Sequence, residues 1–186
     1  MKREYKILLL ASLLANFGAN LIGPFYAVFV QDIGGSILDI GYTISIFSIA
    51  AGVLIIGVGK LSDKINRELI TVIGYYLFAL GSLGYLVIST PNQLFILQIV
   101  FALGTACLAA PLKALFARFI QKGEEGLQWG LEDGGSYIVV GVAVFIGTLV
   151  VNYFGFTVLF LSMFVIQSLA AIIQTRFYIR NYYNYK

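Results

Sequence analysis

One short polar stretch, Gly59-Lys60-Leu61-Ser62-Asp63-Lys64-Ile65-Asn66-Arg67, separates two long apolar segments near the first third of the chain. The apolar segments cover about residues 38–59 and 69–89. Each is long enough to cross a bilayer, because a spanning helix needs about 20 predominantly apolar residues. The stretch therefore predicts a tight turn between two membrane helices, and the rest of the sequence is interpreted outward from it.

The composition also indicates a membrane protein. Of the 186 residues, 60% are hydrophobic and 11% are charged, and the mean hydropathy is +0.91. Soluble domains carry about 25% charged residues, so this chain cannot cover a water-facing surface. Histidine is absent and Cys107 is the only cysteine, which excludes an intrachain disulfide and a metal site of the usual His/Cys kind. We interpret Cys107 as a buried packing residue, and we expect no cofactor and no nucleic-acid partner.

Six segments are long enough to span a membrane. They cover about residues 6–30, 38–59, 69–89, 94–117, 132–153 and 156–177. A signal peptide is the alternative for the first, but its apolar run continues to Val30 and no A-x-A cleavage site closes it. The links are short, the shortest being Phe154–Gly155, so sequential helices should be neighbours. We predict an all-α membrane protein with residues 1–186 in a single six-helix transmembrane domain.

All twelve basic residues fall on one side of the predicted spans. They are Lys2, Arg3, Lys6, Lys60, Lys64, Arg67, Lys113, Arg118, Lys122, Arg176, Arg180 and Lys186. The links on the opposite side carry only Asp32 and Asp39. Because basic loop residues mark the cytoplasmic side, we predict a multi-pass protein of the cell membrane with both termini in the cytoplasm.

Several stretches resemble the major facilitator superfamily of membrane transporters. Residues 59–67 resemble its loop pattern G-x-L-[SA]-D-[KR]-x-G-[RK] between the second and third helices. Gly23-Pro24-Phe25, with Asn16 and Asn20 before it, is similar to the family's first helix. The residue pattern around Gly155 is similar to the family's junction between the fifth and sixth helices. The resemblance covers nearly the whole chain but only the amino-terminal half of a usual twelve-helix member.

The resemblance implies a six-helix half of that fold. Six helices divide into two groups of three, and the odd number inverts the second group relative to the first. A weak internal similarity supports this 3+3 inverted repeat. After Gly57, Asp63 stands three positions before Asn66, and after Gly147, Asn152 stands three positions before Gly155. Chance similarity is the alternative. The resemblance also implies that Gly59, Asp63, Lys64 and Arg67 clasp the opposing half and stabilise an outward-open state.

The chain departs from the family pattern at three places. In the loop, Asn66 replaces Gly and Glu68 replaces a basic residue. Since Asn tolerates a left-handed conformation, we expect the turn to persist. Gln98 stands where many members carry Arg in the fourth helix, so a proton relay built on that Arg is in doubt. Val142-Ala143 replaces the Gly-Pro pair common in antiporters, so antiport is not supported.

Polar residues inside the spans are the candidate substrate-binding groups. Asn16 and Asn20 share one face of the first helix, and Gln98 and Thr105 share one face of the fourth. Mid-membrane polar groups normally face protein or a water-filled cavity. We expect them to line a substrate cavity between these two helices, and interhelical hydrogen bonding is the alternative. We also expect Pro24 to bend the first helix.

Charged residues near the cytoplasmic ends have two interpretations each. Lys113 either snorkels to the surface or pairs with Glu132 or Asp133, as a gate or as part of a carboxylate site. The two acids could instead only favour the positive end of their helix. Asp63 is expected to cap the third helix and to lie within reach of Arg67, and a solvated turn is the alternative to a gating loop.

Glycines suggest how copies of the chain could associate. Gly52 and Gly57 in the second helix, and Gly141 and Gly147 in the fifth, permit close helix approach. In the family geometry these two helices face the other half, so here they are expected to form a dimer interface.

The function favoured by these features is secondary active transport of a small solute, by alternating access, in a homodimer of six-helix halves within the bilayer. A non-transporting scaffold or accessory subunit is the alternative, as is one half of a heterodimeric or excised twelve-helix transporter. An enzyme is disfavoured, because no His, no paired mid-membrane carboxylates and no nucleophile with a base occur. No phosphate-binding loop is present to drive transport with ATP.

Overall fold

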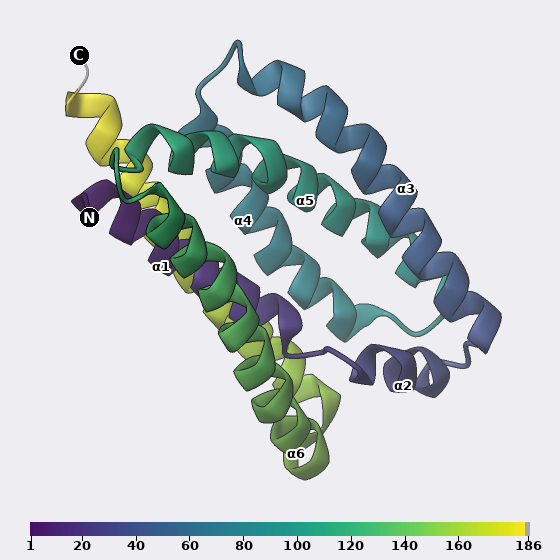
Figure 1. Cartoon of the computed structure of the whole chain (residues 1–186). Helices are drawn as coiled ribbons and strands as arrows, with labels where there is room; N and C mark the ends of the chain where they lie inside the picture. The colour runs from purple at the N-terminus through teal and green to yellow at the C-terminus, as the bar shows by residue number, and fades with distance from the viewer. Residues whose placement is uncertain (185–186) are drawn as a thin grey trace.

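The computed structural model describes residues 1–184, and within them the chain is helical with no strand (Figure 1). The elements are α1 (Arg3–Asn20), α2 (Phe25–Asp32), α3 (Ile37–Ser62), α4 (Arg67–Gly84), the 3₁₀ turn η1 (Tyr85–Val87), α5 (Pro91–Phe119) and α6 (Glu125–Asn184). In this part of the chain four helices are long and apolar enough to cross a membrane, or five if the bent α1–α2 pair is one span. The all-α membrane class is confirmed.

The first predicted span is broken rather than continuous. Helix α1 ends at Asn20 and α2 begins at Phe25, with a bend of 46° between them. Gly23 has φ of 33°, and Pro24 follows it with no N–H to donate. The bend expected at Pro24 is therefore present, as a complete interruption of the helix between Asn20 and Phe25.

Helix α6 also divides into two arms. At Gly155 the backbone has φ of 77° and ψ of 179°, a conformation that residues with a Cβ rarely adopt. The ribbon reverses near this point and returns alongside itself (Figure 1). We call residues 125–154 the first arm and residues 156–184 the second arm. The link predicted at Phe154–Gly155 coincides with this reversal.

The turn between α3 and α4 corrects two details of the sequence interpretation. Asn66 caps α4, since its side chain accepts a hydrogen bond from the Leu69 N–H at 3.0 Å. Its φ is −63°, so Asn66 is extended and not left-handed. The predicted capping by Asp63 was wrong, because Asp63 instead ends α3. The cap consequently does not depend on the residue that the loop pattern shares with the family.

The helices pack in a definite order around the bundle. Helix α1 lies mainly against α6, while α5 lies between α3 and α4 and α4 also contacts α6. The largest apolar cluster joins the α1–α2 break, α2, η1, α5 and both arms of α6, and it includes Phe29, Tyr85 and Phe160 in mutual ring contact. Helix α3 and the first arm contribute little to this core and leave large apolar side chains exposed, as lipid-facing or partner-facing helices do.

The four glycines assigned to a dimer interface have different surroundings. A Cβ at Gly52, Gly57 or Gly141 would meet no atom within 4 Å, so these glycines are open. A Cβ at Gly147 would lie 1.9 Å from the backbone oxygen of Leu21. Gly147 therefore packs within the chain, where it lets the first arm of α6 approach the end of α1, and its assignment to a dimer interface was wrong.

The basic segments gather at one end of the bundle. The start of α1, the α3–α4 turn, the α5–α6 link and the end of the second arm all lie toward the same end in Figure 1. The α2–α3 and α4–α5 links, which carry no basic residue, lie toward the other. This arrangement agrees with the one-sided distribution of charge along the sequence.

Candidate functional site

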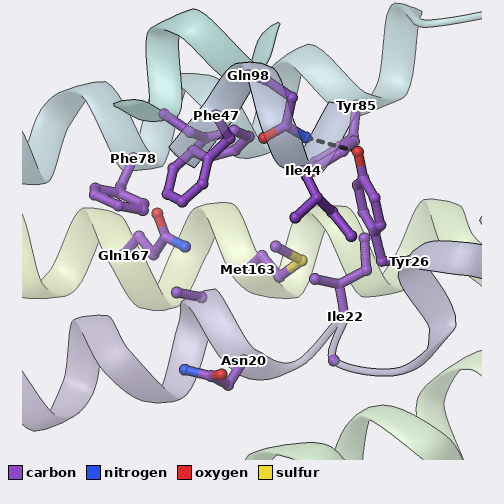
Figure 2. A pocket seen from close by; sticks show the side chains of 13 residues that line it. Asn20, Ile22, Tyr26, Ile44, Phe47, Phe78, Tyr85, Gln98, Met163 and Gln167 are labelled. Carbon is purple, nitrogen blue, oxygen red and sulfur yellow. Dashed lines mark hydrogen bonds between the residues drawn. The ribbon is translucent and has the colours of Figure 1, made fainter. Parts of the chain in front are cut away.

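A cavity of about 550 Å³, which we call cavity 1, lies where the α1–α2 break faces α5. Its polar lining comes from Asn20, Tyr26, Gln98 and Gln167 (Figure 2). Its remaining lining is Ala19, Ile22, Gly23, Ile44, Phe47, Phe78, Tyr85, Phe101 and Met163. Cavities of about 300–1,000 Å³ with mostly apolar walls and a few polar groups are typical of small-molecule sites.

The hydrogen bonds around cavity 1 join distant parts of the sequence. Gln98 is 7% exposed, and its amide nitrogen donates to the Tyr26 hydroxyl at 2.8 Å, which ties α5 to α2. Asn20 donates to the Asn16 side-chain oxygen at 2.7 Å and to the Asn16 backbone oxygen at 2.8 Å. The two asparagines therefore form a local pair, and Asn16 itself does not line cavity 1.

A second cavity of about 300 Å³, which we call cavity 2, lies nearer the basic end of the bundle. Asn16 and Thr105 line it together with Ser12 and Ser136, and Lys113 and Glu132 supply opposite charges. Ala19 and Phe78 line both cavities, so the two spaces adjoin. The four polar residues predicted from α1 and α5 are thus divided, with Asn20 and Gln98 at cavity 1 and Asn16 and Thr105 at cavity 2.

The charged groups of cavity 2 face one space without a direct ion pair. Within residues 1–184, no carboxylate oxygen of Glu132 or Asp133 lies within 4.0 Å of the Lys113 ammonium. Glu132 is half-buried on the cavity wall, whereas Asp133 is exposed and lies outside the lining. The structure therefore brings Lys113 and Glu132 to the wall of cavity 2, and it leaves their neighbour Asp133 outside that lining.

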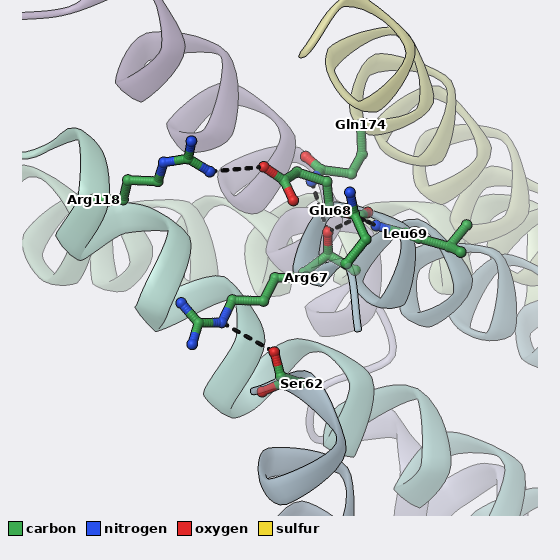
Figure 3. Close-up of polar contacts among 8 residues, drawn as sticks. Ser62, Arg67, Glu68, Leu69, Arg118 and Gln174 are labelled. Atoms are coloured by element: carbon green, nitrogen blue, oxygen red, sulfur yellow. Dashed lines mark hydrogen bonds and ion pairs between the residues drawn. The ribbon is translucent and has the colours of Figure 1, made fainter. Parts of the chain in front are cut away.

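The loop after α3 is held by its own polar contacts (Figure 3). Arg67 donates to the Asp63 carboxylate at 2.8 Å and to the Ser62 carbonyl at 3.2 Å. The predicted contact between Asp63 and Arg67 is therefore present. Lys64 is exposed in the turn, and Gly59 brings α3 to α5, since a Cβ there would lie 3.7 Å from the Ala110 Cβ.

Beside this loop, Glu68, which departs from the family pattern, forms a partly buried ion pair. Glu68 is 7% exposed and its carboxylate pairs with the Arg118 guanidinium at 3.4 Å, joining α4 to the end of α5 (Figure 3). Gln174 of the second arm donates to the buried Thr71 hydroxyl at 2.7 Å one turn further along α4. These contacts connect three helices at the basic end, and sequence reasoning identified neither pair.

Sequence reasoning also missed Gln167, which lines cavity 1 from the second arm of α6. It is 1% exposed, and neither polar atom of its side chain has a hydrogen-bond partner within the described part of the chain. The signal was available, because Gln167 is a polar residue deep inside an apolar span and the same rule had identified Gln98. Applying that rule to the last span as well as to the first and fourth would have found it.

An all-helical membrane bundle with polar-lined cavities among its spans has the construction of a solute carrier. The chain belongs to the Major Facilitator Superfamily, whose sequence profile matches residues 8–184. This confirms the resemblance noted in the loop, and the chain's length is consistent with a half-size unit. Membership places it among multi-pass membrane transporters and not among enzymes.

Named relatives agree with this assignment. The chain is 23% identical over 160 residues to the uncharacterized MFS-type transporter YitZ of Bacillus subtilis (strain 168), covering 86% of this chain and 98% of that protein. It is 27% identical to the uncharacterized MFS-type transporter MJ1560 of Methanocaldococcus jannaschii, over 84% of this chain and 40% of that protein. It is 30% identical to the quinolone resistance protein NorB of Staphylococcus aureus (strain bovine RF122 / ET3-1), over 76% of this chain and 30% of that protein.

Proposed function

We propose that the chain is a secondary active transporter of a small solute, and that cavity 1 is its solute site. The observation that carries the proposal is the pair of adjoining cavities, which offer polar groups inside a membrane bundle of a transporter family. A solute that leaves water needs such groups to replace its hydration. Cavity 2, with Lys113 and Glu132, lies between cavity 1 and the basic end and provides a charged passage toward that side.

The working topology in this proposal has six spans in a 3+3 inverted repeat, within one domain of residues 1–186. The support is the α1–α2 pair taken as one bent span and the reversal of α6 at Gly155, together with the family membership. Both termini lie in the cytoplasm of a cell-membrane protein, because the basic end of the bundle should face inward.

The transporting unit is a homodimer. Alternating access needs one bundle to rock against another, and a six-helix unit supplies one wall of a pathway. Helix α3 and the first arm of α6 offer the second contact surface, since both carry open glycines and exposed apolar side chains such as Val53, Ile56 and Phe145. Gly59, Asp63, Lys64 and Arg67 clasp the neighbouring copy in one state, and the groups near cavity 2, including Asp133, gate the cytoplasmic side.

Gly141→Leu tests this proposal in a single variant. A Cβ at this position meets no atom within 4 Å in one chain, so we expect folding to be unaffected. We expect loss of crosslinked dimer in native membranes and loss of solute flux in proteoliposomes screened with a panel of solutes. Leu80→Trp, which adds bulk to an exposed face of α4, is the matched control and should leave both intact.

Other outcomes distinguish the alternatives. A chain that carries solute as a strict monomer would refute the dimer. A wild-type chain that dimerises but moves no solute in the screen would favour the non-transporting scaffold. Pairing only with a different half-size unit would replace the homodimer with a heterodimer. This second candidate is favoured because the chain matches only 40% of MJ1560 and 30% of NorB, so the rest of each longer relative has no counterpart in this chain.

A further inference from the structure

Gln167 has a polar side chain that is buried in the fold without an evident structural role. It is 1% exposed, and both its amide nitrogen and its amide oxygen lack hydrogen-bond partners among residues 1–184. Leaving both groups unpaired is costly, and a single orphaned buried group in a native structure already requires an explanation. A ligand that bonds both atoms would supply one.

The surroundings place Gln167 at the wall of cavity 1. A Cβ at Gly18 of α1 would lie 2.8 Å from the Gln167 Cγ, so only glycine leaves room for the side chain to lie against α1. Its carboxamide then reaches the cavity between Phe78 and Met163 (Figure 2). The amide nitrogens of the other two carboxamides of the cavity are already engaged, because Asn20 donates to Asn16 and Gln98 donates to Tyr26.

The lining of cavity 1 also restricts the charge of its ligand. Its thirteen lining residues include no Lys, Arg, Asp or Glu. A charged solute would lose its hydration there without a counter-ion, which is strongly unfavourable. Five aromatic rings line the same space, those of Tyr26, Phe47, Phe78, Tyr85 and Phe101. Aromatic rings favour stacked or edge contacts with flat apolar ligands.

We propose that Gln167 is the recognition residue of cavity 1, and that the ligand is an uncharged, flat aromatic solute with adjacent N–H and C=O groups. A carboxamide presents one donor and one acceptor side by side. A lactam or cis amide presents the complementary pair, so two parallel hydrogen bonds would satisfy both orphaned atoms at once. This inference rests on the proposed function, because it takes cavity 1 as the solute site.

The test uses isocarbostyril, an uncharged bicyclic lactam, as the probe. Binding to the full chain in nanodiscs is titrated by fluorescence and compared with N-methylisocarbostyril, which lacks the donor, and with naphthoate and naphthylmethylammonium, which carry charges. We expect isocarbostyril to bind and each comparison compound to bind about tenfold or more weakly, because each leaves a buried group unpaired or a charge without a partner.

Two variants separate recognition from folding. Gln167→Met retains side-chain length but removes both polar atoms, so it should weaken isocarbostyril binding about tenfold or more while raising the melting temperature of the ligand-free protein. Gln174→Met is the matched control, from an equally buried glutamine of the same arm that lies outside cavity 1 and bonds Thr71. It should lower the melting temperature and leave isocarbostyril affinity unchanged.

The inference is overturned if wild-type protein fails to bind isocarbostyril, if Gln167→Met binds it normally, or if naphthoate binds more tightly. These outcomes differ from failure of the proposed function. If the flux screen finds a solute that Gln167→Met transports as well as wild type, the proposed transport function stands and Gln167 is rejected as the recognition residue. Lactam binding that depends on Gln167, without any flux, would retain the site and reject transport.

Discussion

Replacing Gly147 by alanine should damage the bundle where α6 crosses the end of α1. The new Cβ would lie 1.9 Å from the Leu21 backbone oxygen, whereas real Cβ atoms essentially never approach closer than 3.0 Å. The helices must therefore separate locally by about 1.1 Å, and the atom in the way is backbone, which cannot rotate aside. Overpacking of this kind costs about 1–3 kcal/mol, and we expect the upper end because no side chain can yield.

The control has the opposite expected sign. Gly134 lies in the same arm, and a Cβ there meets nothing within 4 Å. Its replacement by alanine should stabilise the helix by up to about 1 kcal/mol, since glycine is the poorer helix former. The two alanine variants should therefore differ in unfolding free energy by about 2–4 kcal/mol, which is a difference of roughly 30- to 1,000-fold in the unfolding equilibrium constant.

Unfolding free energies can be measured by SDS titration in mixed micelles, with melting curves as a second readout. Leu21 precedes two residues that line cavity 1, so Gly147→Ala should also weaken any ligand that binds there. Equal stability of the two variants would refute the close approach of α6 to α1 and, with it, the wall of cavity 1 that depends on this crossing.

Three further predictions concern the basic end of the bundle and the orientation of the chain. Arg118→Leu should lower the unfolding free energy by about 1–3 kcal/mol, because it leaves the buried Glu68 carboxylate without this partner. Adding Glu68→Gln should recover part of that loss. If the double variant is no more stable than Arg118→Leu in the same SDS titration, the ion pair is contradicted. Asp63→Asn removes an exposed ion pair, so stability should change by less than about 1 kcal/mol while flux falls in proteoliposomes; normal flux would reduce the loop to a structural turn. On a background without the native cysteine, Asp32→Cys should react with an impermeant maleimide from outside intact cells and Lys64→Cys only after permeabilisation; the reverse pattern would invert the topology.

Most residues of the candidate site could be predicted from the sequence, but not how they divide between cavity 1 and cavity 2. The helical period placed Asn16 and Asn20 on one face, and they do bond each other. It could not place them on different cavities, because that depends on where α1 ends and how α5 and α6 cross it. Gln167 could have been suspected from its polar character, whereas its lack of a hydrogen-bond partner among residues 1–184 depends on how the second arm of α6 packs against α1.

The sequence by itself determined the membrane environment, the helical class, the turn after α3, the reversal at Gly155 and the sidedness of charge, since each follows from local composition or from single residues. It did not give the start of α6, which lies at Glu125 and not near residue 132. Tertiary structure alone decided which glycine is buried. Gly141 and Gly147 look equivalent along the chain, yet one faces open space and the other contacts the Leu21 backbone. The same applies to Asp63 and Asn66, of which only Asn66 caps α4. Contacts between distant segments depend on how whole helices are placed relative to one another. A local residue pattern describes one helix at a time and therefore does not determine that placement.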